Sequence, residues 1–230
     1  MRLLRDQTFI VVCNIRTPDG PDSEIVGTGI FITKEEKVYL VTAEHVAKDT
    51  SINSYIVYCD NLSNPLTRKL IQLNPSLSWK THSTADIACM EIDCANNVDL
   101  ITNRCLPYDH LNFSDNVSRD NELTCVGFPN GMGALGKFTP FTFRSFFASN
   151  TILLRRFDNH NLCNFFCLEN PSVGGYSGGP VFDLGYRIVG SMTTTTGDTE
   201  LYGIIHGTIT DDTGGKIAAV TPIAYLKDLI

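Results

Sequence analysis

The sequence has no run of basic residues anywhere along its 230 positions. Lysine and arginine together number 18 against 25 aspartates and glutamates, which gives a formal charge of −7 at pH 7. A phosphate backbone attracts the opposite sign of charge. We therefore expect no nonspecific binding to nucleic acid.

A long hydrophobic run is also missing from the chain. The N-terminal segment contains only the short apolar stretch "FIVVC", which is too brief for a signal-peptide core or a membrane span. This stretch instead predicts a first β-strand. Because the sequence starts at Met1 without such a segment, we expect a cytoplasmic protein that has no membrane partner.

No C-x-x-C pair occurs, although the chain has eight cysteines. Most of them lie in apolar, strand-like runs such as "IVYC" and "LTCVGF", where buried free thiols behave as small hydrophobic side chains. Their spacings also differ from those of the common zinc sites. We expect no metal and no cofactor.

Helical periodicity is scarce, and short runs of β-branched and aromatic residues recur instead, among them "GTGIFIT", "VYLVTA", "KLIQL" and "LYGIIHGTI". Many short strands at regular spacing predict an all-β sandwich or barrel. The polar stretch near 95–120 suggests a boundary, so we expect two β units, 1–105 and 106–230. One helix is predicted at the C-terminus, in "TPIAYLKDLI", with Thr221 as N-cap and Pro222 at the first helical position.

The stretch "ENPSVGGYSGGPVFD" places four glycines around Ser177, between two segments that read as strands. Glycine costs more ordering entropy than other residues, so its use at a bend needs a conformational reason. Such a bend could expose the Ser177 hydroxyl and turn N–H groups toward one point, as a nucleophile with an oxyanion hole requires. The alternative is a β-bulge or tight turn that happens to contain a serine.

A nucleophilic serine needs a base and a group that orients the base. Of five histidines, His45 ends the apolar run "VYLVTAEHVA", and His206 in "GIIHGT" is the only rival in a strand setting. Asp86 lies where a polar loop enters the apolar run "DIACMEI", so its carboxylate could accept from an imidazole. The alternatives are a core histidine and a solvated turn aspartate.

These residues carry a family resemblance. The segment "GTGIFITKEEKVYLVTAEHVA" resembles the first-barrel motif of chymotrypsin-fold serine proteases, especially the HtrA/DegP group. "ADIACMEI" is similar to the aspartate motif of that family, and "GYSGGPVFD" to its nucleophile loop. The motifs follow the family order of histidine, aspartate and serine over nearly the whole chain.

The resemblance implies two six-stranded antiparallel β-barrels and a short C-terminal helix. The first barrel would carry His45 and Asp86, and the second Ser177. It implies a serine endopeptidase in which Ser177 is the nucleophile, His45 the base and Asp86 its orienting group. The N–H groups of Gly175 and Ser177 would form the oxyanion hole. The implied substrate-binding residues are Pro171, Ser172, Val173, Ser191, Met192 and Thr193.

None of these pocket residues is acidic, so a preference for Lys or Arg before the scissile bond is not supported. A small or medium apolar residue is the expectation there. His206 could also approach this pocket and recognise an acidic or amide side chain, although a structural role for it is the more common outcome.

Three departures from the family pattern carry information. Ala47 stands where secreted trypsins have a cysteine, and Tyr176 stands where zymogen-activated trypsins have an aspartate. The sequence also ends after the predicted closing helix, where HtrA proteins continue into a PDZ domain. Besides a protein or peptide substrate, we expect an activating or gating partner. An ester hydrolase and a catalytically silent peptide-binding module on the same fold are the alternatives.

Overall fold

The computed structural model describes residues 2–20, 23–60, 62–98, 104–114, 118–210 and 212–230. Its first half consists of the elements η1 (Arg5–Val11), β1 (Val12–Pro18), β2 (Glu24–Lys34), β3 (Lys37–Thr42), α1 (Glu44–Lys48), β4 (Tyr55–Cys59), β5 (Pro65–Lys69), α2 (Leu70–Leu73), β6 (Lys80–Thr81), β7 (Ala88–Ile92), η2 (Cys94–Asn96), β8 (Leu106–Pro107) and η3 (Tyr108–His110). The second half consists of β9 (Leu123–Gly127), η4 (Pro129–Gly131), β10 (Phe141–Ser145), β11 (Ile152–Arg155), β12 (Leu162–Leu168), β13 (Pro180–Asp183), β14 (Tyr186–Val189), β15 (Met192–Thr195), β16 (Glu200–Thr210), β17 (Lys216–Pro222) and η5 (Ile223–Asp228).

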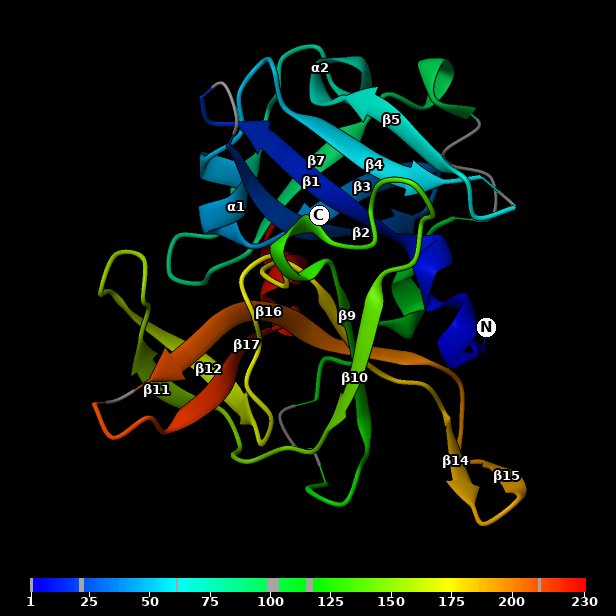
Figure 1. Ribbon diagram of the computed structural model, residues 1–230, viewed down its shortest axis with the longest axis vertical. Helices are drawn as coiled ribbons and strands as arrows, with labels where there is room; N and C mark the ends of the chain where they lie inside the picture. The colour runs from blue at the N-terminus through cyan, green and yellow to red at the C-terminus, as the bar shows by residue number, and fades with distance from the viewer. Residues whose placement is uncertain (1, 21–22, 61, 99–103, 115–117, 211) are drawn as a thin grey trace.

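Two antiparallel sheets dominate the structure, one above the other in Figure 1. In the described part of the chain, the first sheet has eight strands in the order β5-β4-β1-β2-β3-β7-β6, with β8 pairing in parallel to β2. The second has seven, in the order β10-β9-β13-β16-β17-β12-β11. The all-β, double-barrel fold class is confirmed, with eight and seven strands in place of six each.

The sheets divide the chain between β8 and β9, that is, between Pro107 and Leu123. The boundary at 105/106 stays a prediction. The largest core cluster joins the two halves, because side chains from the first sheet, such as Ile30 and Leu40, pack in one group with Phe128 and Ile204 from the second half. This shared core fixes how the ends of the strands face each other, and so positions the site between them.

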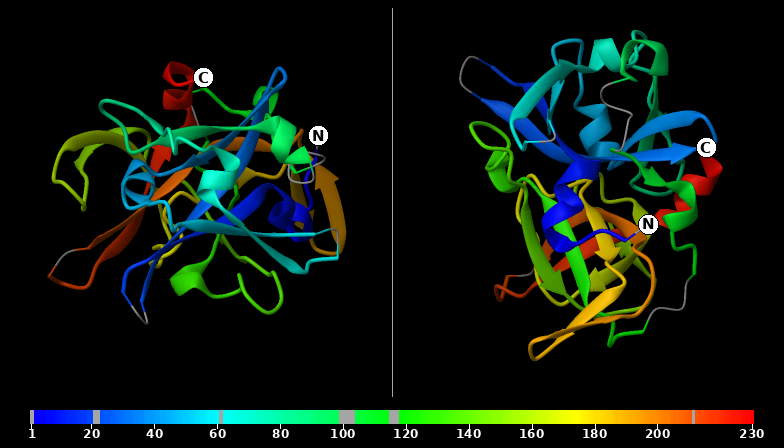
Figure 2. Two further views of the ribbon diagram at one scale, coloured as in Figure 1. Left: turned by 90° about the horizontal axis from the view of Figure 1, so that it is seen from above. Right: turned by 90° about the vertical axis from the view of Figure 1, so that its right-hand side faces the viewer.

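The C-terminal segment differs from the prediction. Thr221 and Pro222 belong to β17, where Thr221 pairs with Ile204, and a 3₁₀ helix begins only at Ile223. Because these two residues pair in the sheet, they do not form the start of the helix that the sequence predicted. The helix η5, red in Figure 2, contacts β16 of the second sheet, and Ile230 beyond it reaches the first sheet, where its carbonyl accepts from Lys34 Nζ.

Two other local predictions had different outcomes. The run "KLIQL" forms one turn of helix, α2, rather than a strand, with Leu70 and Leu73 buried. The eight cysteines, all in the described ranges, are free thiols, and six of them are buried, as predicted. No helix among the described residues is long and apolar enough to span a membrane.

Candidate active site

His45 lies in the first turn of α1, directly after β3 ends at Thr42. The sequence predicted that this histidine ends the strand, whereas the strand stops three residues earlier and a short helix carries the ring. The His45 side chain is 15% exposed, so it borders solvent from a rigid position. Its ring packs edge-on against Phe157, with centroids 5.1 Å apart.

Asp86 is fully buried at the entry to β7, so it is not a solvated turn aspartate. One carboxylate oxygen, Oδ2, lies 2.8 Å from His45 Nδ1, and the other, Oδ1, accepts from the His45 backbone N–H at 3.0 Å. These two contacts fix the position of the His45 ring relative to Asp86. The predicted pair is thus brought together from positions 41 residues apart.

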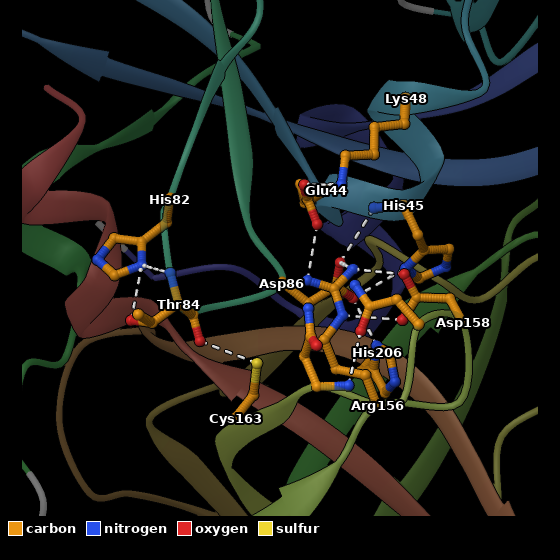
Figure 3. A network of polar contacts seen from close by, with 12 residues as sticks. Glu44, His45, Lys48, His82, Thr84, Asp86, Arg156, Asp158, Cys163 and His206 are labelled. Atoms are coloured by element: carbon orange, nitrogen blue, oxygen red, sulfur yellow. Dashed lines mark hydrogen bonds and ion pairs between the residues drawn. The ribbon is translucent and has the colours of Figure 1, made fainter.

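His206 is a second histidine on the same carboxylate. Its Nδ1 lies 2.5 Å from Asp86 Oδ2 (Figure 3). Its Nε2 accepts from the backbone N–H of Phe157 at 3.3 Å, which places the His206 proton on Nδ1, facing Asp86. The ring is buried and stacks on Phe165, with centroids 4.8 Å apart. His206 therefore contacts the candidate triad, and it is not part of a substrate pocket.

A buried arginine completes the surroundings of Asp86. Arg156, which follows β11, is 4% exposed and donates from Nη2 to Asp86 Oδ1 at 2.9 Å. It also pairs with Asp158 at 2.6 Å and, through Nη1, with Glu44 Oε2 at 2.6 Å. A buried charge is tolerated when it is paired and hydrogen-bonded. Arg156 thereby ties the second sheet to the helix that carries His45.

The donors around Asp86 decide its charge. Burial alone raises the pKa of this carboxyl, but hydrogen bonds from His206 and His45 outweigh burial and hold the pKa well below its usual range. Burial also acts to lower the pKa of Arg156, and its bonds to Asp158 together with the charge of Asp86 reverse this effect. Asp86 is therefore a carboxylate and Arg156 a guanidinium at neutral pH.

Ser177 lies in the predicted bend between β12 and β13, where it borders a cavity. Its hydroxyl donates to the carbonyl of His206 at 3.0 Å. Its own carbonyl accepts from the backbone N–H of Thr28, at 2.8 Å, in the first sheet. The next residue, Gly178, has a φ of +81°, and a Cβ there would lie 2.1 Å from the Thr28 carbonyl oxygen. Only glycine allows this approach of the two sheets beside Ser177.

The glycines before Ser177 orient two peptide groups. The Gly174 carbonyl accepts from Asn130 N–H at 2.7 Å, and the Tyr176 carbonyl accepts from Gly179 N–H at 2.7 Å. In a trans peptide the N–H points opposite to the carbonyl, so the N–H groups of Gly175 and Ser177 point away from these partners. Neither N–H has a hydrogen-bond partner among the described residues.

Gly175 is held in this conformation from two sides. Its φ is +96°, and a Cβ there would lie 2.2 Å from the Phe128 carbonyl oxygen. Its carbonyl accepts from the Thr28 hydroxyl at 2.7 Å. The bend is therefore a constrained loop with a glycine-specific backbone, in contrast to an ordinary turn.

Tyr176 anchors this loop in the core of the second sheet. It is 5% exposed and packs edge-on against Phe143, with ring centroids 5.2 Å apart. Burial raises the pKa of its phenol to about 12. The sequence left open what orders the loop in place of the aspartate of zymogen-activated trypsins. In the structure this position is held by an aromatic side chain that is packed into the core.

A cavity of about 310 Å³ adjoins Ser177. Its lining consists of Phe157, Ser172, Val173, Gly174, Ser177, Gly207, Thr208, Thr210 and Lys216. Ser172 and Val173 lie where the sequence predicted a pocket. Pro171, also predicted there, is exposed and outside this lining.

The structure does not bring Ser191, Met192 and Thr193, also predicted to bind substrate, to this cavity. These residues lie at the turn and in the second strand of the β14–β15 hairpin, a separate two-stranded sheet that projects from the molecule in Figure 1. The cavity is bordered by β16 instead, through Gly207 and Thr208. In the sequence, residues 190–195 and residues 203–208 both look like strands that contain threonine and follow a glycine. The pairing of β16 with β13 and β17 is what brings the second segment to the cavity.

The sequence did not single out Arg156 or Glu44, and it did not place His206 on Asp86. The only signal for Glu44 was its position next to His45. Arg156 and His206 lie 70 and 120 residues from Asp86, in segments without a motif of their own.

His45, Asp86 and His206 each present one ligand atom, within 4.8 Å of one another, which is a spacing that a metal ion could use. These same atoms form the two hydrogen bonds described above, and a guanidinium contacts the same carboxylate. The donor set therefore fits a hydrogen-bonded array better than a cation site.

The comparisons with known proteins agree with this fold. A profile described as trypsin-like peptidase domain matches residues 27–190, well over half of the chain. The active form of the Rv3671c protease from M. tuberculosis has a similar structure, with 15% identity and a TM-score of 0.59 over 96% of this chain and 79% of that one. A serine endoprotease from Yersinia pestis has 16% identity and a TM-score of 0.56 over 99% and 66% of the two chains.

The HtrA-type protease AlgW, crystallised with a tripeptide, has 18% identity and a TM-score of 0.57 over 92% of this chain. The present chain spans only 56% of the AlgW chain. At these identities the structural likeness shows the fold alone. No curated protein sequence gives a match. The profile match over residues 27–190 assigns the family: this chain belongs to the trypsin-like peptidase domain family.

Proposed function

We propose that the protein is a serine endopeptidase that cleaves peptide bonds through an acyl-enzyme. The observation that supports this most is the combination of Ser177 at a cavity, two N–H groups of its loop that have no partner among the described residues, and a histidine held by a buried carboxylate. Acyl transfer by a serine needs groups of these three kinds.

In the first step the Ser177 oxygen attacks the carbonyl carbon of the scissile bond. Nδ1 of His45 is engaged by Asp86, so Nε2 is the nitrogen that accepts the Ser177 proton. The carbonyl oxygen takes up negative charge, and the N–H groups of Gly175 and Ser177 donate to it. His45 then gives the proton to the leaving amine, the C–N bond breaks, and an ester on Ser177 is left.

In the second step water attacks the ester. His45 takes a proton from this water and returns it to the Ser177 oxygen as the ester bond breaks. Asp86 stays ionised throughout, since its donors hold its pKa well below the usual range. The carboxylate therefore stabilises the imidazolium that forms in each step.

Before attack, the Ser177 hydroxyl must leave the His206 carbonyl and turn to His45 Nε2. This hydrogen bond of 3.0 Å supports the alternative, a peptide-binding module that is silent or gated by a partner. The two oriented N–H groups favour the peptidase, because a silent module has no need of unpaired donors beside a serine.

Labelling with a fluorophosphonate probe distinguishes the two. The peptidase predicts a covalent label on the wild type that is lost in Ser177→Ala, together with cleavage of unstructured peptides. A folded wild type that is neither labelled nor able to cleave peptides would support the binding module.

We also propose that the protein resides in a reducing compartment such as the cytoplasm. The eight free thiols support this, since disulfides form in oxidising compartments. Disulfide mapping by mass spectrometry on protein from its native source would contradict the proposal if it found cysteine pairs.

A further inference from the structure

The cavity beside Ser177 has both apolar and hydroxyl groups in its lining, and the structure describes one ionisable side chain there, Lys216. Among the residues that the structure describes, this lining includes no carboxylate. The chain has a net charge of −7, whereas the one charged side chain described in this lining is the exposed cation Lys216. A charged side chain that entered the cavity would therefore meet a positive charge.

The register of β16 and β17 aligns Lys216 with the cavity. Lys216 pairs directly with Thr210, and Ala218 pairs with Thr208. Residues two apart on a strand share a face, so Lys216 and Ala218 lie on the cavity side together with the two threonines. Ala218 is buried in the core of the second sheet, whereas Lys216 is exposed at the cavity. Lys216 makes no hydrogen bond or ion pair with another described residue.

The hydroxyl groups of the cavity are arranged around Ser172. The Thr208 hydroxyl donates to the Ser172 carbonyl at 2.6 Å and accepts from the Ser172 backbone N–H at 3.0 Å. The two hydroxyl oxygens are 2.9 Å apart. Since Thr208 has used its own proton, Ser172 donates in this pair, and its proton can turn to an entering acceptor. A carboxylate would thus find a donor as well as a cation.

We propose that the cavity takes the side chain that precedes the scissile bond, and that Lys216 makes the enzyme prefer an acidic residue, aspartate or glutamate, at that position. This inference rests on the proposed peptidase function and names its substrate class. A basic side chain would be repelled, and an apolar one would desolvate the lysine and the hydroxyls without replacing their partners. The apolar preference expected from the sequence is thereby revised.

The test is a set of fluorogenic peptides that differ only in the residue before the scissile bond, which is Glu, Asp, Gln, Leu or Lys. We expect kcat/KM for Glu to exceed that for the isosteric Gln by about tenfold or more, since the pair differs by one charge facing Lys216. In Lys216→Met, kcat/KM for the Glu peptide should fall to about that for the Gln peptide, while kcat/KM for the Gln peptide should change by less than about threefold. Lys216→Arg should keep the preference for Glu over Gln. Lys216→Glu should cleave the Lys peptide with a higher kcat/KM than the Glu peptide.

Lys69→Met is the matched control, because Lys69 is an exposed lysine on β5 in the other sheet. This variant should leave the ratio of Glu to Gln unchanged. Equal rates for Glu and Gln in a wild type that accepts the fluorophosphonate label would overturn the acidic preference and leave the peptidase standing. A wild type that takes no label and cleaves none of the peptides would overturn both.

Discussion

Asp86 Oδ2 lies 2.5 Å from His206 Nδ1, on the same oxygen that lies 2.8 Å from His45 Nδ1. Two imidazole rings thus share one carboxylate oxygen, and their ring centroids are 5.4 Å apart at an angle of 89°. His206 fixes the carboxylate, and the carboxylate fixes His45. This makes His206 a positioning residue for the candidate triad.

We predict that His206→Ala lowers kcat by roughly 10- to 100-fold with little change in KM, because Asp86 loses the donor that fixes it and His45 becomes misplaced. His206→Asn should restore part of kcat, since its amide can donate to Asp86. Steady-state kinetics on one peptide checks both variants. Equal losses in the two variants would indicate that His206 acts only through the packing of its ring against Phe165.

Gly175 offers a second test, because its backbone conformation excludes a side chain. In Gly175→Ala, the Cβ would meet the Phe128 carbonyl oxygen at 2.2 Å, so the peptide that carries the N–H must shift. We expect a loss of about 10²- to 10³-fold in kcat, the usual effect of removing one oxyanion donor. Gly174→Ala is the stability control, since its Cβ would have its nearest contact at 3.6 Å. Unchanged kcat in Gly175→Ala would exclude this N–H from the oxyanion hole.

Tyr176 anchors the loop through packing. Tyr176→Ala should lower the free energy of unfolding by about 3–5 kcal/mol, as truncation of a buried aromatic side chain does. It should also lower kcat, because the peptides on both sides of residue 176 lose their support. Tyr176→Phe should keep stability within about 1 kcal/mol of the wild type. Urea unfolding and peptide turnover measure the two effects, and full activity in a destabilised Tyr176→Ala would separate anchoring from catalysis.

The charged network around Asp86 predicts how stability depends on pH. The folded-state pKa of Asp86 is held below its unfolded value of about 3.9, so the unfolded chain binds a proton first as pH falls. The stabilisation from this group is therefore complete above about pH 5 and is lost as pH falls below about 4.

Urea unfolding between pH 6 and pH 3 checks this dependence. Asp86→Asn should be less stable than the wild type at pH 6 and should lose less on acidification. Asp49→Asn, which changes an exposed carboxylate at the end of α1, should follow the wild-type slope. Parallel curves for the wild type and Asp86→Asn would show that Asp86 contributes nothing to the acid dependence.

The sequence predicted the parts of the molecule that have local signatures. Ser177 and its glycines, and Asp86 at the start of β7, could be recognised because each lies at a bend or strand entry that its neighbours define. The all-β class followed from short β-branched runs. The conformation of Gly175 was also implied, since a positive φ is what glycine is used for.

The parts that could not be predicted depend on sheet pairing. "GSMTTT" (190–195) and "GIIHGT" (203–208) both begin with glycine and end in threonine, and the strand register places the second one at the cavity while the first forms part of the β14–β15 hairpin. Arg156 forms ion pairs with Asp86 and Glu44 across the two sheets, and no sequence pattern near Arg156 predicts these contacts. "KLIQL" became helical because both of its leucines are buried in one turn.

The central claim is that Ser177 forms a covalent bond with the acyl group of the substrate. Rapid-quench mixing with a peptide ester, followed by mass spectrometry of the digested protein, tests it most directly. The account predicts an added acyl mass on the peptide that contains Ser177, and no such mass in Ser177→Ala. Turnover of the ester without any acyl mass on Ser177, or with the mass on another residue, would contradict it.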